Sequence, residues 1–179
     1  YFDIRKDTLY CDPKNSEKRK STLLLLNIIL NSLLRWFAPI LSFTTEEIYQ
    51  LVPKLKKSIH LEKFLNFPKK FENLKINEKW HKLVLIRDAC NLSIEEKRAT
   101  KEIGSSLESS LEIELDQKLF NLFKEINFAE LCIASSANIK VSSEKEIKVT
   151  TSKAIGKKCP ICWKISEEGC QRPNCKIQK

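Results

Sequence analysis

The sequence contains no methionine. No signal peptide is expected in it, because no basic segment precedes a short apolar stretch near its start. It opens on Tyr1-Phe2-Asp3, which indicates a fragment of a longer protein. The most apolar run, Leu23 to Phe37, is interrupted by polar side chains and falls short of the roughly 20 apolar residues that cross a bilayer. We therefore expect no membrane partner.

Disulfide bonds are not expected either. There are seven cysteines, an odd number that cannot pair completely, and no secretory signal is visible. Cys11, Cys90 and Cys132 are scattered, whereas the last four crowd into the C-terminal tail. This distribution favours a reducing, cytoplasmic environment.

Acidic residues are too few to balance the basic ones, so the net charge is +9 and the isoelectric point is near 9.2. A basic excess of this size favours a polyanionic partner such as a nucleic acid. Most of the cations are lysines, so the alternative is a soluble lysine-rich surface that has no such partner.

The first part of the chain, to about residue 75, has a helical pattern. Apolar side chains between Leu23 and Phe37 cover most of a helix surface, which predicts a helix in the middle of a bundle, ended by Pro39. Trp36 is interpreted as part of that core. Another helix is expected to start with a capping box between Thr44 and Glu47.

Asn77 is expected to cap a second long helix. Its apolar face would consist of Trp80, Leu83, Val84, Ile86, Cys90 and Ile94. Charged residues from Glu95 to Glu102 would form the solvated face. Gly104 is expected to be the left-handed residue that follows the helix.

The pattern changes after residue 106. Apolar and polar residues alternate from Leu107 to Leu115 and from Lys145 to Thr150, which predicts two half-buried strands. Residues 119–126 have helical spacing, and the apolar run Phe128–Ala134 is interpreted as an interior strand. We therefore expect a small α+β unit at 106–152.

Four cysteines in the tail are arranged like zinc ligands. Cys159 and Cys162 form a C-x-x-C pair that can bind one face of a tetrahedral ion, and Cys170 and Cys175 would complete the set. Four thiolates leave no open position for a catalytic water, so we expect one structural Zn²⁺ ion. The alternatives are a redox pair, free thiols or a disulfide, although a redox C-x-x-C would not need the second pair.

Trp163 directly follows one of these cysteines in a basic segment. It is either a partly exposed surface on which an unpaired base stacks, or a side chain that packs the tail onto the rest of the protein. The cations around it are those expected of a segment that contacts phosphate groups.

Four sequence segments resemble the C-terminal region of bacterial isoleucyl-tRNA synthetases. They are residues 1–10 (YFDIRKDTLY), 35–48 (RWFAPILSFTTEEI), 101–108 (KEIGSSLE) and 158–163 (KCPICW). Related forms of the second segment occur in valyl, leucyl and methionyl enzymes, whereas the last two resemble isoleucyl enzymes in particular. The chain departs from the family in its second cysteine pair, which is C-x-x-x-x-C in place of C-x-x-C, and in Ile161, which replaces an arginine.

The resemblance implies a mainly α fold. A helical-bundle anticodon-binding domain would occupy residues 1–105, followed by the α+β unit at 106–152 and a four-cysteine zinc finger at 153–179. The parent enzyme would use ATP to attach isoleucine to tRNA(Ile), with its catalytic and editing domains upstream in the same polypeptide. None of their nucleotide-binding motifs occurs here, so this part is expected to be non-catalytic and the protein monomeric.

Binding to the anticodon region would assign roles to six side chains. Cations hold phosphates, and we expect such contacts from Arg5, Lys6, Lys157, Lys158 and Arg172. Unpaired bases are read by stacking, for which Trp163 is the candidate. The alternatives are a stand-alone zinc-ribbon adaptor that binds nucleic acid and the same region of a valyl or leucyl relative.

Overall fold

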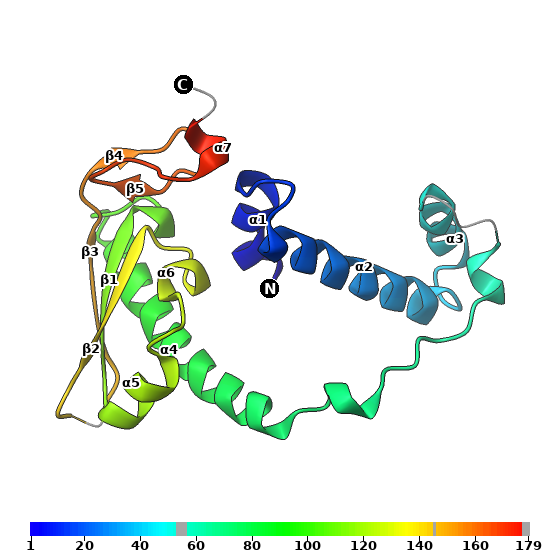
Figure 1. Ribbon diagram of the computed structural model, residues 1–179, viewed down its shortest axis with the longest axis horizontal. Coiled ribbons are helices and arrows are strands. Elements are labelled where there is room, and N and C mark those ends of the chain that lie inside the picture. Colours follow the sequence, from blue (N-terminus) through cyan, green and yellow to red (C-terminus); the bar gives the residue numbers. More distant parts are fainter. Residues whose placement is uncertain (53–56, 145, 177–179) are drawn as a thin grey trace. The chain divides into compact units, whose positions relative to one another are not determined.

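A computed structural model describes residues 1–52, 57–144 and 146–176 (Figure 1). The chain divides into two compact units, of which one comprises Tyr1–Pro13 with Asn73–Lys179 and the other Lys14–Glu72. The described residues are mainly helical, with a small sheet, as the sequence predicts. The finer division at 1–105, 106–152 and 153–179 stays a prediction.

The first unit combines helices with two small sheets. In chain order its elements are α1 (Phe2–Cys11), α4 (Leu74–Ala99), the 3-10 turn η3 (Ser106–Glu108), β1 (Ser109–Leu115), α5 (Gln117–Phe123), α6 (Phe128–Leu131), β2 (Ser136–Val141), β3 (Lys148–Lys153), β4 (Lys157–Lys158), β5 (Ile165–Ser166) and α7 (Pro173–Lys176). Strand β1 lies between β2, to which it is parallel, and β3, to which it is antiparallel. Strands β4 and β5 form a separate antiparallel hairpin. We call residues 157–176 the knuckle.

The core of this unit lies between α4 and the three-stranded sheet, which run alongside each other in Figure 1. Every second side chain of β1 is buried there, because side chains alternate between the two faces of a strand. The predicted alternating strand is therefore confirmed. The buried residues of α4 are Leu83, Ile86, Cys90 and Ile94. They confirm most of the predicted apolar face, but Trp80 is half exposed.

Both predicted ends of α4 are wrong. The side chain of Asn73, rather than that of Asn77, caps the helix by accepting a hydrogen bond from the Ile76 amide at 3.2 Å. The left-handed residue after the helix is Lys101, with φ of 60°, and not Gly104. Asn73 and Asn77 are both suitable N-cap residues, and the helix begins after the earlier of the two.

The predicted interior strand at Phe128–Ala134 is also wrong. Residues Phe128–Leu131 form α6, started by Asn127, whose side chain accepts from the Glu130 amide at 3.0 Å. The strand β2 begins only at Ser136. A short continuous apolar run fits a buried helix as well as a strand, and here the cap decides for the helix.

The second unit contains α2 (Glu17–Phe37), α3 (Ser42–Leu51) and the 3-10 turns η1 (Ile59–Leu61) and η2 (Lys69–Phe71). Its small buried cluster consists of Leu34, Ala38, Tyr49 and Ile59. Helix α2 ends just before Pro39, as predicted.

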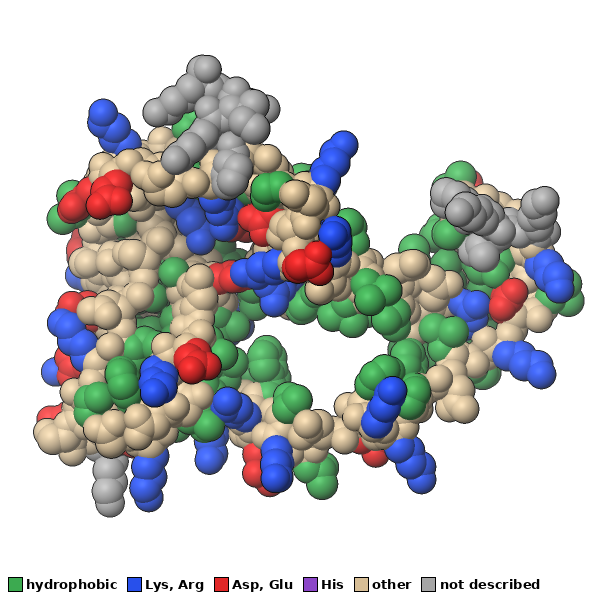
Figure 2. All heavy atoms as spheres, in the orientation of Figure 1, with side chains coloured by type: hydrophobic (Ala, Val, Ile, Leu, Met, Phe, Trp, Pro, Cys, Tyr) green, Lys and Arg blue, Asp and Glu red, His purple; other side chains and the backbone are tan. Residues whose placement is uncertain are grey.

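The expectation that α2 lies in the middle of a bundle is not met within this unit. The helix packs against α3 and η1, which are too short to cover it. Leu23, Leu24 and Leu30 are exposed, and Figure 2 shows hydrophobic side chains open on this helix. Trp36 is 56% exposed, so its interpretation as a core residue is wrong for the described unit.

Helix α3 starts earlier than predicted and without the predicted capping box. Its N-cap is Leu41, which makes no side-chain bond, so Thr44 and Glu47 lie inside the helix. The buried side chains are Thr45 and Tyr49, and the Thr45 hydroxyl donates to the Leu41 carbonyl at 2.9 Å.

Among the described helices, none combines the length and apolar character needed to cross a membrane.

Candidate metal centre and adjoining groove

The knuckle begins with a tight hairpin. Gly156 enters it with φ of 125°, and a Cβ atom there would meet the Ser166 backbone at 2.3 Å, so only glycine fits. Between β4 and β5 the chain turns at Trp163, whose φ is 63° and whose amide donates to the Cys159 carbonyl at 3.0 Å. This turn brings the first two cysteines together.

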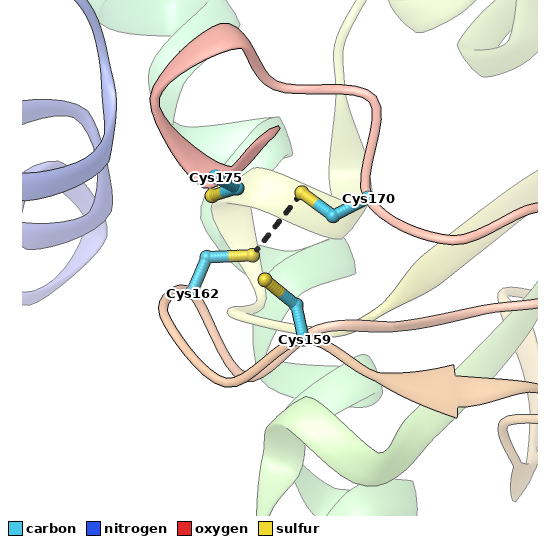
Figure 3. Close-up of side chains that lie close together, drawn as sticks. All are labelled: Cys159, Cys162, Cys170 and Cys175. Carbon is cyan, nitrogen blue, oxygen red and sulfur yellow. Dashed lines mark hydrogen bonds between the residues drawn. The ribbon is translucent and has the colours of Figure 1, made fainter. Parts of the chain in front are cut away.

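The sulfurs of all four knuckle cysteines converge. The Sγ atoms of Cys159, Cys162, Cys170 and Cys175 lie within 4.8 Å of one another. Figure 3 shows them gathered from the hairpin turn, the loop that follows it and the short helix α7. The Cys162 and Cys170 sulfurs are 3.7 Å apart. A tetrahedral zinc ion with bonds of about 2.3 Å separates its sulfur ligands by about 3.8 Å. The four side chains could therefore hold one metal ion.

The backbone near Cys159 favours the thiolate form that binds metals. Burial alone would raise the pKa of this thiol, but the amides of Cys162 and Ile161 donate hydrogen bonds to its sulfur and lower the pKa to about 7. Burial raises the pKa of Cys162 and of Cys175. Metal binding would therefore release protons mainly from those later thiols.

Helix α1 contacts the knuckle through Asp7. Its carboxylate accepts a hydrogen bond from the Arg172 guanidinium at 2.5 Å and lies 3.9 Å from the Lys164 ammonium. We call these three residues the Asp7 cluster. Burial would raise the pKa of Asp7, but the hydrogen bond and charge of Arg172 outweigh it and hold the pKa below its usual value. One helical turn further on, Cys11 is buried among the knuckle cysteines.

A groove of about 430 Å³ lies beside this contact. Helix α1 lines it with Lys6 and Tyr10, the turn after α6 with Ile133, and the knuckle with Ile161 and Trp163. Trp163 is 59% exposed, which is compatible with stacking of an unpaired base. Of the six side chains predicted to contact RNA, Lys6 and Trp163 share this groove.

The remaining predicted contacts are separated from one another. Arg5 on α1 forms an ion pair with Glu130 at 2.6 Å, and Arg172 belongs to the Asp7 cluster. Lys157 and Lys158 are exposed neighbours on β4, and Lys158 lies 3.3 Å from Glu108. The structure therefore places Arg5, Arg172 and Lys158 in ion pairs within the chain. Only the two lysines lie on an exposed strand.

Sequence reasoning did not single out Asp7 or Cys11. Asp7 pairs with Arg172 across 165 positions of the chain, and no local pattern reports such a distant contact. One signal was available: a spacing of four residues places Asp7 and Cys11 on one face of a helix. A cysteine left over from a four-ligand set, on the same face as a carboxylate, indicates a packing surface.

Comparisons with known proteins match this chain to tRNA ligases. A family model described as the anticodon-binding domain of tRNA ligase matches residues 1–115. The isoleucine–tRNA ligase of Pelagibacter ubique is 58% identical over 172 residues, which cover 96% of this chain and 19% of the relative. That of Bradyrhizobium diazoefficiens is 38% identical over 179 residues, covering 93% of this chain and 18% of the relative. The chain thus spans about a fifth of the length of these curated relatives.

Proposed function

The chain belongs to the family of anticodon-binding domains of tRNA ligases, and from this premise we propose that it binds the anticodon region of tRNA(Ile) as part of an isoleucine–tRNA ligase. The family match over residues 1–115 carries the proposal, and the 58% identical relative supports isoleucine over valine or leucine. The parent enzyme would be a cytoplasmic monomer that uses ATP to attach isoleucine to its tRNA. The catalytic and editing steps would belong to other parts of it. A stand-alone adaptor is not favoured, because the matched family consists of tRNA ligase domains.

We propose that Cys159, Cys162, Cys170 and Cys175 bind one structural Zn²⁺ ion. The spacing of their sulfurs supports this ligand set, and four soft thiolates suit zinc in tetrahedral geometry. The ion would hold the hairpin turn against the following loop and α7. The knuckle has little else to do so, since its buried cluster consists of cysteines with Ile161 packed against them.

The exposed side chains are the strongest candidates for contact with RNA. Trp163 in the groove would stack on an unpaired base, and Lys157 and Lys158 would hold phosphates. Lys6 would act from the edge of the same groove. Lys6 and Lys158 also pair with carboxylates, but their side chains stay exposed. Arg5 and Arg172 are largely buried in their ion pairs and would have to share their charge with the carboxylates that they contact.

The chain is expected to bind a synthetic anticodon stem-loop of tRNA(Ile) in preference to that of a tRNA for another amino acid. Because cations displace counterions from phosphates, log K should fall linearly with log salt, with a slope of about −0.7 to −0.9 per phosphate contact. Fluorescence anisotropy at several salt concentrations measures both quantities. Equal affinity for both stem-loops, or binding that does not depend on salt, would contradict the proposal.

Replacing both exposed lysines of β4, as Lys157→Ala with Lys158→Ala, is expected to weaken stem-loop binding and to reduce the salt slope by about two. The matched control is Lys140→Ala with Lys148→Ala on the three-stranded sheet, since Lys140 also pairs with a glutamate. The same anisotropy titrations apply. A slope that changes equally in both double variants would mean that only net charge matters.

A further inference from the structure

The Asp7 cluster joins helix α1 to both halves of the knuckle. Lys164 follows the first cysteine pair, whereas Arg172 lies between the two cysteines of the second pair. Both cations approach the same carboxylate, Arg172 at 2.5 Å and Lys164 at 3.9 Å. The three side chains are between 21% and 29% exposed, so solvent screens them only in part. The two cations can converge only when the two halves of the knuckle are held together.

Cys11 provides a second contact at the same surface, and its thiol also hydrogen-bonds to the Asp7 carboxylate. It is 5% exposed and lies in one buried cluster with Cys159, Cys162 and Cys175, although its own sulfur is outside the group of four that could hold a metal. The thiol of Cys11 therefore packs against the outside of the metal centre. Helix α1 covers that side of the centre with an apolar thiol and a carboxylate one turn apart.

We propose that docking of α1 and metal loading of the knuckle are energetically coupled, and that Asp7 is the positioning residue that couples them. A metal ion that holds the two cysteine pairs together brings Arg172 and Lys164 to one point, where Asp7 binds both. By linkage, the docked helix must favour metal binding as much as the metal favours docking. The inference concerns this chain's own residues and stands whether or not the partner is a tRNA.

The coupling gives the ion pair between Asp7 and Arg172 a structural role. Arg172 serves the contact between α1 and the knuckle, which explains why it is half-buried while Lys157 and Lys158 are exposed. Helix α1 also forms one wall of the groove that contains Trp163. Docking of α1 therefore completes that groove, and a knuckle without metal would leave it open on one side.

The test compares Asp7→Asn with Asp3→Asn, which removes the same charge from the same helix. Asp3 contacts Lys6 of its own helix and is 73% exposed, so its loss should not disturb docking. The first measurement is zinc affinity, by competition with a chromophoric chelator. The second is the rate at which Cys11 is alkylated in the zinc-loaded chain, with the modified cysteine identified by mass spectrometry. Cys90 and Cys132, buried in the core, serve as internal standards.

We expect Asp7→Asn to lower zinc affinity about tenfold, within the range found for groups outside the first ligand shell, and to expose Cys11 to alkylation. Asp3→Asn should change neither. Arg172→Ala should reproduce both effects, and the double variant of Asp7 and Arg172 should be no worse than either single one. If zinc affinity or Cys11 protection in Asp7→Asn matches that of Asp3→Asn, the coupling does not exist.

Discussion

Removal of zinc by a strong chelator is expected to unfold the knuckle while the core between α4 and the sheet stays folded. A structural zinc site contributes on the order of 10 kcal/mol to the folding of its segment. The knuckle has almost no apolar cluster besides its cysteines, so little can replace this energy. The larger core contains none of the four ligands and should not respond.

Amide hydrogen exchange reports this difference at named positions. The amides of Cys159, Trp163 and Cys175 donate to backbone carbonyls within the knuckle, at 2.9, 3.0 and 3.1 Å. Their protection should be lost without zinc and restored when the ion is added back, whereas the amides of β1 should stay protected. Metal analysis of the loaded chain should give about one zinc per molecule. Knuckle amides that stay protected in a metal-free chain would refute the zinc proposal.

The metal centre could be predicted because its ligands are close in sequence. The C-x-x-C spacing and the crowding of four cysteines into the tail report the site directly. The Asp7 cluster could not, because its carboxylate and its guanidinium come from opposite ends of the chain. Single-sequence patterns describe local geometry, and tertiary ion pairs leave no local trace.

Among the strands and helices, too, some could be predicted from local pattern and others could not. The alternation of Leu111, Ile113 and Leu115 predicted β1 correctly, since a period of two has no helical counterpart. The run Phe128–Ala134 has no period, so it could not distinguish α6 from a strand. The apolar residues of α2 identified a helix but not what covers it, because burial depends on neighbours that the sequence pattern does not name.

Helix α4 allows the core to be tested with two adjacent residues. Ile86 is 0% exposed in the cluster that joins α4 to the sheet, whereas Leu85 is 62% exposed. Ile86→Ala should therefore lower the free energy of unfolding of this unit by about 2–5 kcal/mol, through lost burial and the cavity that remains. Leu85→Ala should change it by no more than about 0.5 kcal/mol.

Urea unfolding followed by circular dichroism measures both variants, and comparing zinc-loaded chains keeps the knuckle constant. The pair controls for helix propensity, since each replacement puts alanine at the middle of the same helix. Equal losses in the two variants would mean that Leu85 is covered in solution. A small loss in both would mean that α4 does not pack on the sheet. Either result would contradict the core described here, because that core requires neighbouring positions of α4 to differ in burial.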